Sequence, residues 1–172
     1  MKMDFYKTIS KGYDELYGNE QKFKVDMIKE NLKIKNNDLL LDVGCGTGLS
    51  SDFDCNVIGI EPLFELIQQN KSNTGKSKIS GTNSVGKKIM AAAENIPFKD
   101  NVFDKVISIT AIHNFKDIKK SIKEIKRVGK KDFVFSVLKK SSKFDFIEKE
   151  IKNNFEIKKI LDGKKDWIFI CQ

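Results

Sequence analysis

The sequence LLLDVGCGTG at residues 39–48 combines an apolar run and an acid with a glycine at every second position. Only Asp42 interrupts the apolar run, which predicts a strand buried on both faces, as in a parallel sheet covered by helices. Gly44, Gly46 and Gly48 have no Cβ atom, so they predict a tight turn where a ligand can lie directly against the main chain. The stretch therefore predicts an α/β fold with a binding site at the carboxyl end of this strand.

The glycine spacing and a second strand indicate the kind of ligand. A dinucleotide fingerprint reads G-x-G-x-x-G, whereas the third glycine here comes one residue earlier. A second apolar run, Val57 to Ile60, ends at Glu61. A carboxylate at a strand tip can accept hydrogen bonds from both hydroxyls of a ribose. Together these features favour a nucleoside ligand without phosphate.

Three segments carry a resemblance to a known family: LLLDVGCGTG at 39–48, GIEP at 59–62 and AENIPFKDNVFDKVISITAIHNF at 93–115. They resemble the class I S-adenosylmethionine-dependent methyltransferases, in particular the methyltransferase type 11 or ubiquinone-biosynthesis branch. The resemblance implies a doubly wound, mostly parallel seven-strand sheet that ends in an antiparallel hairpin. It also implies S-adenosylmethionine as the cofactor.

The same resemblance assigns residues to the cofactor. The first-strand acid and glycine loop hold its methionine end, the second-strand acid holds the ribose, and the A-E-x-x-P-F segment borders the adenine. On this basis the expected cofactor-binding residues are Asp42, Gly44, Cys45, Gly46, Gly48, Glu61, Pro62, Ala93, Glu94, Thr110 and Tyr13. The family often has Asp where Ala92 stands, so Glu94 is the candidate to replace that contact.

His113 is the only histidine of the chain and follows the predicted strand from Phe103 to Thr110. This position suits a general base or a substrate anchor, and a buried structural histidine is an equally weighted interpretation. The Pro-Pro-aromatic segment of many nucleobase and glutamine methyltransferases does not follow Asn114, which argues against those subfamilies.

Apolar periodicity places the remaining elements. We expect one domain over residues 1–172, with residues 1–32 forming a helical cap. The expected helices cover 4–17, 20–32, 63–70, 118–128 and 144–151, with a turn or two of helix in 49–56. The expected strands cover 88–92, 103–110, 133–138, 155–161 and 166–171, and a loop is expected over 71–86. Asp162-Gly163 predicts a hairpin turn, and strands joined by a tight turn are antiparallel.

Composition narrows the function classes. The chain has a net charge of +8, but its lysines are dispersed, which favours solvated surfaces over a nucleic-acid site. Three cysteines without a C-x-x-C pair indicate neither a disulfide framework nor a metal site. No apolar run approaches membrane-spanning length and the first residues lack a signal-peptide core, so we expect a cytoplasmic protein.

Three functions remain open. The first is methyl transfer to a small molecule by a monomer or weak homodimer. The second is methylation of RNA or protein, with a small activator subunit as a possible partner. The third is a protein that binds S-adenosylmethionine without catalysis, an option to which the short segment after Gly48 and the alanine at position 92 lend weight.

Overall fold

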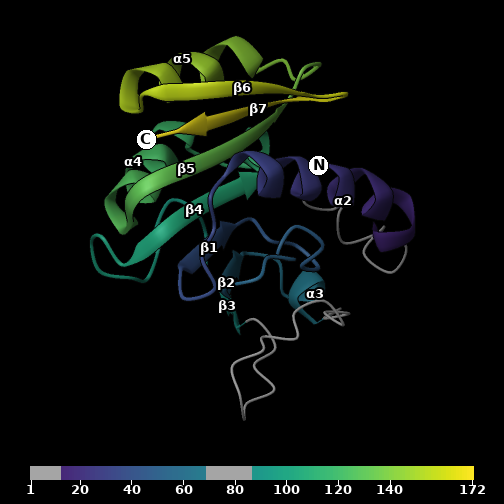
Figure 1. Ribbon diagram of the computed structural model, residues 1–172, viewed down its shortest axis with the longest axis vertical. Helices are drawn as coiled ribbons and strands as arrows, with labels where there is room; N and C mark the ends of the chain where they lie inside the picture. The colour runs from purple at the N-terminus through teal and green to yellow at the C-terminus, as the bar shows by residue number, and fades with distance from the viewer. Residues whose placement is uncertain (1–12, 69–86) are drawn as a thin grey trace.

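The computed structural model describes residues 13–68 and 87–172, with side chains from Tyr17 onward. Within these residues, seven strands form one sheet in the order β3-β2-β1-β4-β5-β7-β6 (Figure 1). The strands are Leu39–Val43 (β1), Asn56–Glu61 (β2), Lys87–Met90 (β3), Phe103–Ile109 (β4), Gly129–Leu138 (β5), Ile157–Gly163 (β6) and Asp166–Cys171 (β7). Only β7 runs antiparallel to its neighbours, β5 and β6. The predicted doubly wound sheet with a C-terminal antiparallel hairpin is therefore confirmed.

Helices cover both faces of the sheet. They are Tyr13–Asn31 (α2), Phe64–Ile67 (α3), Ile118–Val128 (α4) and Phe144–Asn154 (α5), with a 3-10 turn at Ile112–Asn114 (η2). Successive strand residues point to opposite faces, so Val134 packs in the cluster with α2 whereas Phe133 and Phe135 pack in the cluster with α4 and α5. The predicted apolar stripe of α4 is buried against the sheet.

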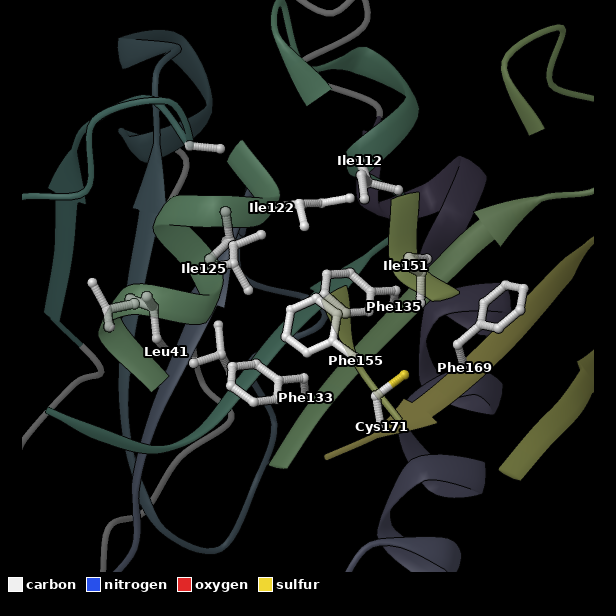
Figure 2. Close-up of a cluster of buried hydrophobic side chains, with 14 of the residues drawn as sticks. Leu41, Ile112, Ile122, Ile125, Phe133, Phe135, Ile151, Phe155, Phe169 and Cys171 are labelled. Atoms are coloured by element: carbon white, nitrogen blue, oxygen red, sulfur yellow. The ribbon is translucent and has the colours of Figure 1, made fainter. Parts of the chain in front are cut away.

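The core on the α4 and α5 face contains a group of aromatic rings. Figure 2 shows Phe133 and Phe135 of β5 beside Phe155, whose ring centroid lies 4.6 Å and 5.2 Å from theirs. Ile122 and Ile125 of α4 are fully buried in the same cluster. Burying side chains of this kind contributes roughly 1.5–3 kcal/mol each, so this core fixes β5 and, beside it, the strands whose carboxyl ends form the site.

The N-terminal helices differ from the prediction. Instead of a break between two helices, α2 continues through Gly18 to Asn31, and the predicted part from residue 4 to residue 12 lies outside the described residues. A side chain at Gly18 would meet no atom within 4 Å. Glycine costs a helix about 1 kcal/mol, and burial of Val25 and Ile28 on the same helix outweighs that cost.

Several other boundaries move. The hairpin turn lies at Lys164 and Lys165, two residues after the predicted Asp162-Gly163, because Gly163 still pairs with Asp166. The Asp162 side chain stabilises this turn by accepting a 2.9 Å hydrogen bond from the Lys164 amide. Residues 49–55 form turns and bends with no helix, β3 ends at Met90, and β5 begins at Gly129. The predicted loop over 71–86 lies outside the described residues.

Candidate active site

A pocket opens at the carboxyl ends of β1, β2 and β4, where the chain order of the sheet reverses between β1 and β4. Such a switch point is where open α/β sheets bind their ligands. The pocket is lined by Gly44, Gly46, Glu61, Pro62, Leu63, Leu66, Ala91, Ala92, Ala93, Glu94, Ile109, Thr110, Ala111, Asn114, Phe115 and Lys116. Seven of the predicted cofactor residues are in this set: Gly44, Gly46, Glu61, Pro62, Ala93, Glu94 and Thr110.

The glycine loop after β1 adopts a backbone that favours glycine. The φ angles of Gly44, Gly46 and Gly48 are 80°, 53° and 96°. A Cβ atom on Gly44 would lie 2.5 Å from the Cβ of Ala111, whereas one on Gly46 would meet no atom within 4 Å. The loops after β1 and β4 therefore touch at Gly44, and the main chain at Gly46 borders open space.

Asp42 lies beneath this loop. Its side chain is fully buried, and Oδ2 accepts 2.7 Å hydrogen bonds from the hydroxyls of Ser50 and Ser51. Burial raises the pKa of Asp42, although the serine hydrogen bonds oppose that effect. Asp42 is not among the described residues that line the pocket, so the geometry gives it contacts that support the loop.

Glu61, the last residue of β2, joins the second strand to the glycine loop. Its Oε2 accepts a 3.1 Å hydrogen bond from the Gly46 amide, and Oε1 accepts one of 3.0 Å from the Leu63 amide. Burial raises the pKa of Glu61, and the two backbone hydrogen bonds oppose this only in part. Each carboxylate oxygen has a second lone pair, so the residue retains acceptor capacity toward the pocket that it lines.

Lys88 is a site residue that the sequence reasoning missed. From β3, its ammonium group donates hydrogen bonds to the carbonyl oxygens of Thr47 and Gly46. Lys88 pairs with Gly59 on β2, where a Cβ atom would lie 2.5 Å from the sulfur of Cys45. Glycine inside a strand often marks a close approach of this kind, so Gly59 signals the contact with Cys45 but does not point to Lys88. Cys45 therefore packs against β2 and does not line the pocket.

The segment after β3 is held by α4. Arg127 donates hydrogen bonds of 3.0 Å to the carbonyl of Ile96 and 2.7 Å to that of Phe98. Glu124 accepts one of 3.0 Å from the Ile96 amide, and its hydrogen bonds with Arg127 lower its pKa. The Glu94 carboxylate accepts from the amides of Lys116 and Asp117 at 2.7 Å and 3.1 Å. Glu94 therefore borders the pocket while fixing the start of α4.

The structure does not place the remaining predicted residues in the pocket lining. Gly48, like Asp42 and Cys45, is not a lining residue, and its position beside the Lys88 ammonium ties the loop to β3. His113 is 4% exposed within η2 and lies outside the lining, while the next residue, Asn114, belongs to it. The side chain of Tyr13, at the start of α2, lies outside the described residues. Catalytic use of His113 and cofactor contact by Tyr13 stay predictions.

Across residues 13–68 and 87–172, no three His, Cys, Asp or Glu side chains gather in a way that could hold a metal ion. Cys45, Cys55 and Cys171 carry free thiols. Burial raises the pKa of Cys55 and of Cys171 to about 12, which makes both poor nucleophiles at neutral pH. In the same part of the chain, no helix is long and apolar enough to cross a membrane.

A protein-family model described as "Methyltransferase domain" matches residues 41–137, which include the strands and loops that form the pocket. The chain belongs to this methyltransferase family. S-adenosylmethionine, the cofactor that the sequence resemblance implies, is the family's cofactor, and that prediction is confirmed at this level.

Two curated relatives match most or part of this chain. The uncharacterized protein MJ1252 of Methanocaldococcus jannaschii is 31% identical over 176 residues, covering 94% of this chain and 66% of that protein. The human mitochondrial arginine-hydroxylase NDUFAF5 is 29% identical over 101 residues, covering 59% of this chain and 28% of that protein. The chain thus spans between about a quarter and two thirds of these relatives' lengths.

Two solved structures share the fold. An S-adenosylmethionine-dependent methyltransferase from Aquifex aeolicus gives a TM-score of 0.74 at 18% identity, covering 96% of this chain and 97% of that one. A putative methyltransferase from Haloferax volcanii, solved in complex with the Trm112 methyltransferase activator, gives 0.76 at 12% identity, with 96% of each chain covered.

Proposed function

We propose that this chain binds S-adenosylmethionine at the pocket between β1, β2 and β4 and transfers its methyl group to a small-molecule acceptor. The observation that carries the proposal is the junction of Glu61 with the glycine loop at the Gly46 amide. It puts a buried carboxylate and an uncovered stretch of main chain on the wall of one pocket.

The residues present fit the cofactor. Gly46 leaves room for its methionine end against the backbone, Glu61 has acceptor capacity for the ribose hydroxyls, and Ala92 and Ala93 offer a small apolar wall to the adenine. When bound, the cofactor supplies a sulfonium-activated methyl group that carries its own leaving group. The chain's part is to orient the acceptor and exclude water, which its apolar lining at Leu63 favours.

The surface charge supports a small acceptor over RNA. Several exposed lysines in the described residues form ion pairs with a nearby acid. The pairs include Lys22–Asp26, Lys119–Glu150, Lys130–Asp104, Lys152–Glu148, Lys158–Glu156 and Lys165–Glu20. Nucleic-acid binding needs lysines free to neutralise phosphates, so this arrangement favours solvation.

The experiment follows the methyl group itself, because one relative of this chain carries the name of a hydroxylase. Purified protein and isotope-labelled S-adenosylmethionine are incubated in three separate reactions. The first contains a metabolite extract, the second total RNA and the third total protein. Label in the metabolite fraction supports the proposal. Label in RNA, with binding that weakens steeply as salt rises, would replace the small molecule with RNA as the acceptor. Label in protein would indicate a protein acceptor.

Two further arms test for an activator subunit and for binding without catalysis. The Haloferax volcanii neighbour was solved with an activator subunit, so the assay is repeated with an archaeal Trm112-type protein added. Cofactor binding without methyl transfer in any arm would favour a non-catalytic binding protein.

A further inference from the structure

A fully buried lysine of α2 lies close to the pocket without lining it. The Lys24 ammonium donates hydrogen bonds of 2.9 Å to Glu20 and 2.8 Å to the hydroxyl of Thr110. It also lies 3.1 Å from the carboxylate of Asp166, which is fully buried as well. Lysine is almost never fully buried unless paired, and Lys24 has polar partners in Glu20, Thr110 and Asp166. Its burial in this cluster therefore does more than fill the core.

Asp166 is the centre of the cluster. Its Oδ2 accepts a 2.9 Å hydrogen bond from Thr110 and a short one from Ser136, in addition to its contact with Lys24. These four residues come from α2, the end of β4, β5 and the start of β7. One carboxylate oxygen thus ties four elements together at the carboxyl edge of the sheet.

Thr110 connects this cluster to the pocket. It lines the pocket, and its φ of 56° is left-handed, a genuine outlier for a β-branched residue. Strained backbone persists only where the surroundings over-determine it, and it concentrates at functional sites. All three hydroxyl contacts of Thr110, with Lys24, Ser136 and Asp166, lie within the cluster. The next residue, Ala111, contacts the Gly44 position, so a shift of Thr110 would move the pocket wall.

We propose that Lys24 and Asp166 are positioning residues that hold Thr110 in its left-handed conformation and thereby set the wall of the cofactor pocket at the end of β4. A buried ion pair is weak evidence for stability alone. Here it has a second effect, because the strained residue it holds lines the pocket. The inference rests on the proposed cofactor site and adds to it a dependence on α2.

The chain offers a matched control at the opposite edge of the sheet. Lys105 of β4 is also buried and pairs with Asp132 and Asp38, but none of these three residues lines the pocket. Lys24→Met and Lys105→Met each remove one buried ammonium group and put a side chain of nearly the same size as lysine in its place. The readouts are the melting temperature and the dissociation constant for S-adenosylhomocysteine.

Lys24→Met should weaken S-adenosylhomocysteine binding about tenfold, in the range of coupling between residues in contact. Lys105→Met should lower the melting temperature but leave the dissociation constant unchanged. Equal weakening by both variants, or unchanged affinity in a folded Lys24→Met, would overturn the proposal. Ser136→Ala removes one donor to Asp166 and no charge, so it replaces Lys24→Met if that variant does not fold.

A double-mutant cycle separates positioning from general loss of structure. Glycine adopts a φ of 56° without support, so Thr110→Gly should make the affinity insensitive to Lys24→Met. Additive losses in the double variant would contradict the proposal. Wild-type protein that fails to bind S-adenosylhomocysteine would overturn the cofactor assignment and this inference together. Binding by the wild type with no coupling would overturn this inference alone.

Discussion

The amino ends and the carboxyl ends of the strands form two opposite edges of the sheet. Both edges contain a buried lysine paired with aspartate, but the two pairs hold different groups. At the amino edge, Lys105 bridges Asp132 and Asp38, joining the beginnings of β4, β5 and β1. At the carboxyl edge, Lys24 pairs with Asp166, but that pair also holds Thr110. Buried lysine pairs are thus common to both edges.

Left-handed backbone around a pocket is what distinguishes the carboxyl edge. Gly44, Gly46, Gly48 and Thr110 all have positive φ, and they surround or support the pocket. At the amino edge, Asn101 has a φ of 54°, but asparagine tolerates this region far better than threonine. The site is therefore marked by left-handed backbone beside a cavity, strained only at Thr110, while buried charge alone marks only structure.

The largest expected effect is that of Gly44→Ala. An added Cβ would clash with Ala111 at 2.5 Å on a left-handed backbone. Strain of roughly 1–3 kcal/mol, concentrated at the ligand, should weaken S-adenosylhomocysteine binding up to about a hundred-fold. Isothermal calorimetry measures this effect.

Gly18→Ala is the control, because its new methyl group meets no atom within 4 Å on α2. It should raise the free energy of unfolding by about 0.5–1 kcal/mol and leave binding unchanged. Equal affinities for Gly44→Ala and wild type would show that the glycine loop does not contact the ligand.

Glu61→Ala comes next. Loss of hydrogen bonds to a charged acceptor should cost roughly 1.5–3 kcal/mol of binding, or about ten- to a hundred-fold in affinity. Glu148→Ala on α5, which is partly exposed and does not line the pocket, is the matched control and should bind as the wild type does. If titration finds Glu61→Ala unimpaired, the ribose must be held elsewhere.

The raised pKa of Glu61 gives a pH dependence with a definite sign. The folded apo-protein holds this proton more tightly than the unfolded chain, so Glu61 lowers stability as pH rises from 4.5 through its raised pKa. The ribose needs the ionised acceptor, so affinity should increase over that same window. Calorimetric titration from pH 4.5 upward should show this rise for the wild type and a flatter profile for Glu61→Gln. Matching profiles would assign the pH effect to another group.

Asp104→Asn should have the smallest effect, because it changes only the amino edge. The hydrogen bond from Lys130 lowers the pKa of Asp104, so its contribution to stability is present above pH 3.8 and is lost as pH falls through the lowered pKa. Exposed pairs of this kind contribute under about 1 kcal/mol. Thermal unfolding at pH 7 should show a small decrease, with ligand affinity unchanged. A large change in affinity would break the distinction between the edges.

The sequence predicts the features that depend on local signals. The apolar run of β1, the glycine loop and Glu61 at a strand tip are each visible within a few residues, and the structure brings them to one pocket. The hairpin was also recognisable, although a two-residue shift of its turn followed from pairing between Gly163 and Asp166. Local propensity does not determine such a register.

The supporting residues carry no local signal. Lys24 contacts Thr110 across 86 positions of sequence, and Lys88 contacts Thr47 across 41. A lysine in a chain rich in lysine looks like a solvated side chain until the fold buries it. Gly18 led to the opposite error, because it predicted a break between two helices. Packing of α2 against the sheet outweighs the small cost of a glycine in a helix.

We propose that the pocket at the carboxyl edge binds S-adenosylmethionine. The most direct test of this proposal is calorimetric melting of the wild type with S-adenosylhomocysteine, NAD or ATP. A ligand that binds only the folded state raises the melting temperature, and the rise grows with the logarithm of the ligand concentration divided by its dissociation constant. S-adenosylhomocysteine should raise it, and NAD and ATP should leave it unchanged. A rise with NAD and none with S-adenosylhomocysteine would contradict the account.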